Sequence, residues 1–395
     1  MRLQPLSDQV VVITGASSGI GLTTARMAAR AGAKVVMTAR DEETLREEAQ
    51  RIRDEGGEAT FLAGDVADPE TLSRVARHAV LTYGRIDTWV NNAGIGVYGL
   101  AEEVSLADMR RLFDVTFWGT VHGCLAALPR LKENGGVLIN VGSVDSEISV
   151  PYHSAYAAAK HAVKGFTNAL RMEVEKEGAP VAITLVKPAG IDTPFFEHAK
   201  NYMEGNPKPP PPAYAPDVVA RTILRCAERP VRDIIVGGSG RVMVGLQKAF
   251  RRGTDRLFEA TMFSGQQTDR PTRHDRAGAL YSTGPFNGRE RGQYDGMVRS
   301  TSLSTELAMR PAQSVLGIAL LGIAAVGAAS LMRGSSRRAL VGYARRAREL
   351  PRNMRVRAPE REPQAELQAW EPRERYVDYD ERLPEMPPRT PELNF

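Results

Sequence analysis

Residues 9–21 read QVVVITGASSGIG and carry the strongest fold signal in the chain. The first part, up to Ile13, is a short apolar run rich in β-branched residues, which is typical of a buried parallel strand. The second part is rich in glycine and leads into a segment with helical spacing, 20–31. Glycines at such a turn let the backbone approach a pyrophosphate, whose charge the helix N-terminus stabilises. The stretch therefore predicts a strand, a phosphate-binding turn and a helix.

Strand-like and helix-like segments go on alternating as far as about residue 240. Strands are predicted at 33–38, 59–62, 88–91, 136–141, 181–186 and 233–236, and helices at 42–55, 69–83, 106–131, 156–176 and 217–227. This alternation indicates an α/β fold with a doubly wound parallel sheet of the Rossmann type. In such a sheet the ligand crevice lies at the carboxyl ends of the strands.

Three candidate catalytic residues lie close together in the sequence. Ser143 follows the predicted strand 136–141, and Tyr156 and Lys160 begin the next predicted helix. Because Tyr156 and Lys160 are four residues apart, they share one helix face. A free phenol has a pKa of ~10, and a nearby ammonium favours its phenolate form. A seryl hydroxyl can donate a further hydrogen bond, so the three residues are candidates for acid–base chemistry; the alternative is an exposed tyrosine beside a solvated lysine.

These motifs together resemble the short-chain dehydrogenase/reductase family, from about Leu6 to Gly237. The glycine spacing is GxxxGxG, residues 91–94 read NNAG, and residues 188–193 read PAGIDT, with Ala189 where the family usually has glycine. The resemblance implies that Tyr156 donates the proton to the nascent alkoxide and that Ser143 positions the carbonyl. It also implies that Lys160 binds the nicotinamide ribose.

One catalytic position departs from the family. Residues 114–119 read DVTFWG, so Thr116 stands where the family has an asparagine that holds a water between Lys160 and solvent. A threonine hydroxyl can make one such hydrogen bond but lacks the reach of an amide. The proton relay is therefore expected to be weakened or rerouted.

The resemblance also implies a set of cofactor-binding residues at the strand ends. Ala39 and Arg40 end the second predicted strand, where a carboxylate would favour a ribose 2′-hydroxyl. The planar guanidinium of Arg40 can pair with a 2′-phosphate instead, so NADP(H) is expected in preference to NAD(H); the alternative is a solvated surface arginine. The implied set is Gly15, Ser17, Ser18, Gly19, Ile20, Gly21, Arg40, Asp65, Val66, Asn92, Ala93, Gly94, Tyr156, Lys160, Pro188, Ile191 and Thr193.

Composition narrows the class of protein further. The two cysteines, and the lack of any Cys/His cluster with ligand spacing, argue for a reducing compartment and against a disulfide framework or a metal site. The whole positive excess lies after residue 250, where 24 arginines face 18 acidic residues. An excess of this size does not imply nucleic acid binding. We expect a cytoplasmic catalytic domain.

The chain divides into four parts. Residues 1–240 are the predicted catalytic domain, 241–313 a helical and irregular tether, 314–357 an apolar helix followed by an Arg-rich amphipathic segment, and 358–395 a disordered tail rich in proline and acids. The apolar run 315–332 is about 27 Å long as a helix, enough for a bilayer core. Membrane association through 315–350 is expected, with a soluble packed or dimerising helix as the alternative.

The sequence thus predicts an NADP(H)-dependent oxidoreductase that interconverts a carbonyl and an alcohol on an apolar small molecule. Six aromatic, histidine and methionine residues are candidates for the substrate pocket, and His153 is expected to be a loop residue rather than a second base. Family resemblance suggests a homodimer or homotetramer. The alternative is a non-catalytic dinucleotide-binding sensor or scaffold at a membrane. The pocket candidates are Tyr152, His153, Phe195, Phe196, Tyr202 and Met203.

Overall fold

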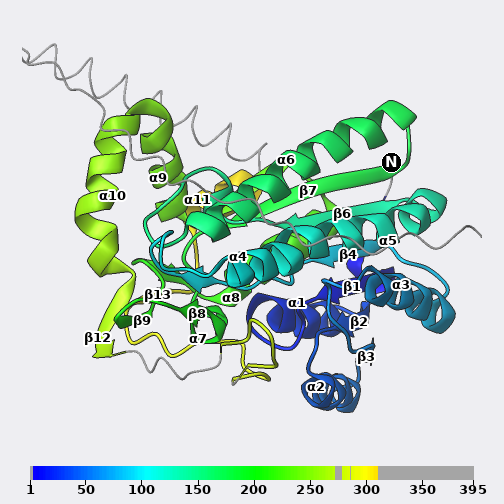
Figure 1. Ribbon diagram of the computed structural model, residues 1–395. Helices are drawn as coiled ribbons and strands as arrows, with labels where there is room; N and C mark the ends of the chain where they lie inside the picture. The colour runs from blue at the N-terminus through cyan, green and yellow to red at the C-terminus, as the bar shows by residue number, and fades with distance from the viewer. Residues whose placement is uncertain (1–2, 272–277, 285, 310–395) are drawn as a thin grey trace, which may run out of the picture. The chain divides into compact units, whose positions relative to one another are not determined.

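The computed structural model describes residues 3–271, 278–284 and 286–309, all within the compact unit Met1–Ala324. Its centre is a parallel sheet of seven strands (Figure 1). In chain order these are β1 (Val10–Thr14), β2 (Lys34–Thr38), β3 (Glu58–Phe61), β4 (Thr88–Asn91), β6 (Gly136–Val141), β7 (Val181–Pro188) and β11 (Asp233–Val236).

The strand order across the sheet is β11-β7-β6-β4-β1-β2-β3. Strands β1 to β3 extend from the middle to one edge, and the later strands extend from β4 to the other edge. In the centre, Ile13 of β1 pairs with Met37 of β2 on one side and with Val90 of β4 on the other. The direction of winding therefore reverses between β1 and β4, and in open α/β sheets ligands bind at the carboxyl ends beside such a reversal.

Helices cover both faces of the sheet, and each layer has its own apolar core (Figure 1). One layer is made by α1 (Gly19–Arg30), α2 (Glu42–Asp54) and α8 (Pro216–Glu228). The other layer is made by α3 (Pro69–Tyr83), α4 (Leu106–Phe113), α5 (Gly119–Asn134) and α6 (Ser154–Glu177). The doubly wound fold predicted from the alternation of strands and helices is confirmed.

The predicted helix 106–131 is interrupted in the structure. Between α4 and α5 the backbone makes one π-helical turn, η2 (Asp114–Trp118), which contains Thr116. Single π turns widen a helix locally and are often found at functional sites. The family motif at this position therefore coincides with an irregular turn that the 3.6-residue periodicity did not reveal.

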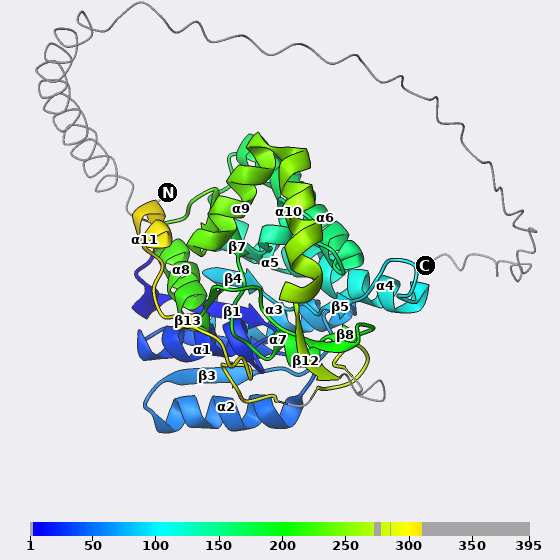
Figure 2. The same ribbon diagram turned by 90° about the vertical axis from the view of Figure 1, so that its left-hand side faces the viewer.

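The predicted tether 241–313 contains regular structure where it is described. Two helices, α9 (Gly238–Ala249) and α10 (Arg251–Gly265), pack Val244 and Phe258 against Ile148. After them β12 (Gln267–Pro271) pairs with β9 (Gly205–Pro207), and β13 (Val298–Arg299) pairs with β10 (Ala213–Tyr214) (Figure 2). The remaining short elements are η1 (Leu6–Asp8), β5 (Val97–Tyr98), η3 (Val144–Ser146), α7 (Phe195–His198), β8 (Lys200–Asn201) and α11 (Leu303–Met309).

The apolar run 315–332, the Arg-rich segment after it and the tail 358–395 lie outside the described residues. Among the helices that are described, none combines the length and the apolar character needed to cross a bilayer. The predicted C-terminal apolar helix and its membrane contact are therefore not supported by the described part of the chain.

Candidate active site

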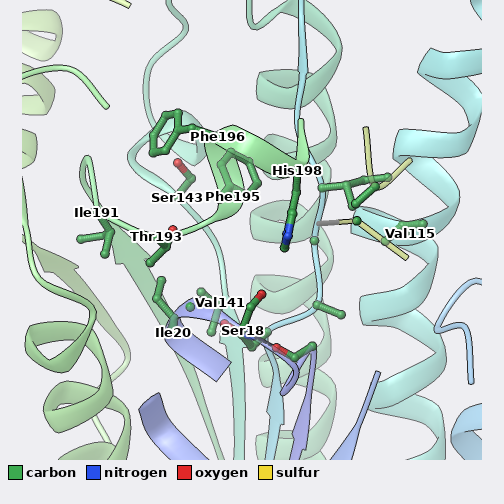
Figure 3. A pocket seen from close by; sticks show the side chains of 18 of the residues that line it. Ser18, Ile20, Val115, Val141, Ser143, Ile191, Thr193, Phe195, Phe196 and His198 are labelled. Atoms are coloured by element: carbon green, nitrogen blue, oxygen red, sulfur yellow. Dashed lines mark hydrogen bonds between the residues drawn. The ribbon is translucent and has the colours of Figure 1, made fainter. Parts of the chain in front are cut away.

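A cavity of about 250 Å³ opens at the carboxyl ends of β1, β4, β6 and β7. Figure 3 shows Ser18 and Ile20 on one side of it, and Ser143, Thr193, Phe195 and His198 on the other. Of the residues predicted to be catalytic or cofactor-binding, Gly21 and Thr116 do not line it. Those that do are Gly15, Ser17, Ser18, Gly19, Ile20, Arg40, Asp65, Val66, Asn92, Ala93, Gly94, Ser143, Tyr156, Lys160, Pro188, Ile191 and Thr193.

The glycine turn between β1 and α1 depends on its missing side chains. Gly15 has φ +66° and Gly19 has φ +54°, in the region that favours glycine. At Gly21 an added Cβ would lie 2.1 Å from the carbonyl oxygen of Gly15. The Asn92 Nδ2 donates to the carbonyl oxygens of Thr14 (3.0 Å) and Gly15 (3.2 Å) and so holds this turn. The turn is the kind of close backbone cradle that a pyrophosphate requires.

Ser143, Tyr156 and Lys160 lie together and are each more than nine-tenths buried. Ser143 caps η3, and its Oγ accepts a hydrogen bond of 3.1 Å from the backbone N–H of Asp145. Lys160 Nζ donates to the carbonyl oxygen of Val141 (2.8 Å) and lies 5.8 Å from the centre of the Tyr156 ring. The three side chains predicted from spacing therefore meet at the carboxyl end of β6.

The sequence predicts that the Lys160 ammonium, together with the charge of an oxidised nicotinamide, lowers the pKa of Tyr156, whereas the groups of the chain by themselves raise it. Burial raises the pKa of Tyr156 and the nearby Asp145 charge raises it further, while a hydrogen bond with Ser143 lowers it. Burial also lowers the pKa of Lys160, to about 8, against the opposing effect of Asp145. Desolvation disfavours both charged forms. Tyr156 is consequently held as a neutral phenol, able to donate a proton.

Asp145 and His153 form a buried pair beside this cluster. Asp145 Oδ2 lies 3.1 Å from His153 Nδ1, and both side chains are more than nine-tenths buried. The His153 ring stands edge-on to Tyr98 (centroids 4.5 Å apart) and to Tyr156 (5.7 Å). The sequence did not single out Asp145, because nothing in the pattern shows that a carboxylate two residues after Ser143 is buried. His153 lies in the loop just before α6, as expected, but it is buried and in contact with Asp145.

Two phenylalanines of α7 line the cavity beside Tyr156 and Tyr98. Phe195 lies 5.6 Å from the Tyr156 ring and Phe196 lies 6.2 Å from the Tyr98 ring. Of the predicted pocket residues, His153, Phe195 and Phe196 line the cavity. The other three point elsewhere: Tyr152 packs against Phe263, Tyr202 donates to Asp108, and Met203 is buried in the small cluster around Tyr98.

Thr116 is fully buried behind Gly94 and does not reach the cavity. Its Oγ1 lies 3.5 Å from the backbone N of Ile95, and its carbonyl oxygen accepts a hydrogen bond of 2.9 Å from Thr120 Oγ1. A Cβ placed on Gly94 would lie 3.9 Å from Thr116 Oγ1 and 3.7 Å from Lys160 Nζ. Thr116 thus stands near Lys160, with both its hydroxyl and its carbonyl already engaged by the chain.

Glu147 anchors the loop that carries Ser143. Lys164 and Lys187 each place Nζ 2.8 Å from one of its carboxylate oxygens. Burial alone would raise the pKa of Glu147, but the hydrogen bonds and charges of these two lysines lower it to about 2. Because Lys187 is itself buried, loss of the Glu147 carboxylate leaves its ammonium with the longer contact to Asp233, at 3.5 Å, in place of the 2.8 Å pair.

We expect Glu147→Gln to reduce the free energy of unfolding at pH 7 by about 3 kcal/mol. The carboxylate has a lower pKa in the folded chain than in the unfolded chain, so its contribution is present above about pH 4.5 and is lost as the pH falls towards 2. Urea unfolding of both proteins between pH 7 and pH 3 measures the difference, which should shrink on acidification. The control is Glu133→Gln, which removes an exposed ion pair with Arg130. Equal effects of the two changes on the free energy of unfolding would contradict the anchoring role of Glu147.

Comparisons with known proteins agree with this geometry. The short chain dehydrogenase family profile matches residues 9–203. YxnA of Bacillus subtilis, an uncharacterized oxidoreductase, is 44% identical over 336 residues, which cover 84% of this chain and 94% of YxnA. A metagenomic short-chain oxidoreductase solved in complex with NADP is 29% identical, with a TM-score of 0.50 over 58% of this chain and 97% of that chain. A short chain dehydrogenase/reductase from Burkholderia phymatum, solved in complex with NAD, shares the fold, with a TM-score of 0.57, 24% identity and coverage of 67% and 98%.

The Rossmann sheet, the glycine turn and these relatives define an oxidoreductase that uses a nicotinamide dinucleotide. The chain belongs to the short-chain dehydrogenase/reductase family. Members of this kind are NAD(P)-dependent enzymes, and solved neighbours of this chain hold NADP or NAD.

Proposed function

We propose that the protein is an NADP(H)-dependent oxidoreductase that interconverts a carbonyl and an alcohol on an apolar small molecule. The observation that carries this proposal is the meeting of Ser143, Tyr156 and Lys160 at the floor of a cavity whose other wall is the glycine turn. The turn fits a dinucleotide, because its glycines leave room for a pyrophosphate and the α1 N-terminus faces that room. When bound, the nicotinamide supplies or accepts the hydride.

The proton is handled by the chain itself. In the reducing direction Tyr156 Oη gives its proton to the carbonyl oxygen, and the raised pKa of this phenol keeps the proton in place until it is needed. Ser143 Oγ holds the carbonyl oxygen by a hydrogen bond. Lys160 Nζ stays close to the Tyr156 ring, where its charge stabilises the phenolate that forms. In the oxidising direction the same groups act in reverse.

The walls of the cavity favour an apolar substrate next to the reacting carbon. Phe195 and Phe196 cover Tyr156 and Tyr98, and Ile95 and Val144 line the same end. Burying such walls against an apolar substrate is favourable, by about 25 cal/mol for each Å² removed from water. We therefore expect hydrophobic aldehydes, ketones or secondary alcohols to be better substrates than sugars.

The preference for NADP(H) rests on Arg40, which follows β2 and lines the cavity. We expect the protein to bind NADPH at least tenfold more tightly than NADH, since a hydrogen bond to a charged group contributes about 1.5–3 kcal/mol. Arg40→Gln should weaken NADPH binding by ten- to hundredfold and leave NADH binding within twofold. Fluorescence titration measures both dissociation constants, with Arg46→Gln, an exposed arginine paired with Glu42, as the control. A tenfold preference of the unaltered protein for NADH would contradict the assignment.

A further inference from the structure

A segment from beyond the Rossmann sheet crosses the mouth of the cavity. Residues 278–284 and 286–293, which we call the strap, form the yellow trace beside α1 and α7 in Figures 1 and 2. Ala279, Thr283, Gly284 and Asn287 of the strap line the same cavity as the glycine turn and Tyr156. The strap thus forms a wall of the cofactor site that the family motifs do not contain.

On the nucleotide side the strap is bonded to the glycine turn. The Gly288 N–H donates to the carbonyl oxygen of Ser17 (2.8 Å), and the Gly19 N–H donates to the carbonyl oxygen of Arg289 (2.9 Å). Glu290 pairs with Arg26 of α1 at 2.6 Å. These contacts fasten the middle of the strap directly over the turn that would hold a pyrophosphate.

Arg40 is bonded to the start of the strap. Its guanidinium donates to the backbone carbonyl oxygens of Ala279 and Leu280. A guanidinium has five N–H donors, so these two bonds leave others for a 2′-phosphate. The residue proposed to select NADP(H) therefore also holds the strap in place at the adenosine end of the cavity.

On the substrate side the strap is bonded to α7 and to the end of β7. The Ala279 N–H donates to the carbonyl oxygen of His198 (2.7 Å), and the Gln293 N–H donates to Glu197 Oε1 (2.6 Å). Arg291 lies 3.7 Å from Asp192. The strap therefore spans the cavity: one set of bonds joins it to the glycine turn and α1, and the other joins it to α7 and Asp192.

The bonds that hold the strap are hydrogen bonds and ion pairs rather than an apolar core. Gly278, Ala279 and Leu280 are buried, but the rest of the described strap is exposed or half-buried. Segments with few buried apolar contacts open locally at low free-energy cost, without unfolding of the domain. The strap can therefore lift while the sheet stays intact.

We propose that the strap completes the cofactor site and acts as its gate, lifting each time a dinucleotide enters or leaves. Thr283 and Asn287 face the adenosine half of the bound cofactor, and the two sets of bonds hold the strap closed during turnover. This inference rests on the proposed function, because it takes the occupant of the cavity to be NADP(H). A strap that were only part of the packing would affect stability and leave the rates of cofactor exchange unchanged.

The kinetics of NADPH exchange test the gate. The double variant E290Q/R291Q removes the ion pair with Arg26 on one side of the cavity and the ion pair with Asp192 on the other. Neither substituted residue lines the cavity. Arg26 keeps its second partner, Glu48. The buried Asp192 loses its ion pair with Arg291 and keeps the backbone hydrogen bonds of Gly292 and Tyr294. Because closing is weakened while the nucleotide contacts are kept, the association and dissociation rates should both rise, by roughly tenfold, with the dissociation constant within twofold. R221Q is the control. Arg221 donates a hydrogen bond to the carbonyl oxygen of Ser300, later in the same segment, and this contact lies outside the cavity.

Unchanged rates in stopped-flow fluorescence, or a rise in the dissociation rate alone, would overturn the gate. Hydrogen exchange of the unaltered protein gives a second reading that needs no variant. Bound NADPH should slow exchange at the Ala279 and Gly288 amides at least tenfold, and no slowing there would overturn the proposal. Tight NADPH binding with unchanged association and dissociation rates in the double variant would contradict the gate and leave the proposed function standing. Failure of the unaltered protein to bind NADPH or NADH would contradict the proposed function as well.

Discussion

Replacing Tyr156 with phenylalanine is expected to lower kcat by two to four decades, which is what one positioned acid–base group contributes. The change removes the hydroxyl that would protonate the carbonyl oxygen and keeps the ring, which packs against Phe195 at 5.6 Å. The neighbouring Lys160 keeps its hydrogen bond to Val141, so the wall of the cavity is preserved. The NADPH dissociation constant should therefore stay within about threefold of that of the unaltered protein.

The comparison that isolates the hydroxyl is Tyr152→Phe. Tyr152 lies four residues earlier, packs against Phe263, and does not line the cavity. Its variant should retain nearly full activity under the same steady-state assay. If Tyr156→Phe kept most of its activity, or if both variants lost activity equally, the proton would have to come from another group.

Gly21→Ala is expected to raise the NADPH dissociation constant at least hundredfold, although Gly21 does not touch the cavity. An alanine Cβ would lie 2.1 Å from the Gly15 carbonyl oxygen and 2.8 Å from its carbonyl carbon, so the turn and α1 must move apart. Such overpacking typically costs 1–3 kcal/mol in stability. The displaced backbone also no longer presents its N–H groups to the pyrophosphate. Isothermal titration and thermal unfolding measure the two effects.

Gly165→Ala supplies the matched control for that change. Gly165 lies within α6, and a Cβ there would meet nothing within 4 Å. Because alanine has the higher helix propensity, this variant should be as stable as the unaltered chain or slightly more so. Undisturbed NADPH binding by Gly21→Ala would mean that the turn is not the pyrophosphate site.

The sheet and the positions of the motifs could be predicted because they rest on local patterns. The β1 residues are all buried and read as a continuous apolar run, and the turn after them needs glycine for reasons of backbone geometry alone. Tyr156 and Lys160 share a helix face by their spacing. Since the carboxyl ends of parallel strands lie along one edge of the sheet, motifs from six different strand ends were expected to meet, and they line one cavity.

The features that escaped prediction depend on contacts between distant segments. The strap has no periodicity, because backbone hydrogen bonds and ion pairs such as Glu290–Arg26 hold it. Its partners lie about 80 to 270 residues earlier in the chain. The Asp145–His153 pair could not be seen from spacing, since either residue alone suits an exposed loop. The direction of the Tyr156 pKa shift depended on burial, which the sequence does not display.

The central claim is that a phenol in the crevice passes a proton to a carbonyl as a nicotinamide reduces it. The most direct measurement incubates the full-length protein with NADPH and a panel of hydrophobic aldehydes and ketones, and quantifies the alcohol formed against the NADPH consumed. We predict one alcohol for each NADPH with at least one member of the panel, and formation at least about a hundredfold slower with Tyr156→Phe. Alcohol formation that persists at the full rate in the variant would contradict the claim.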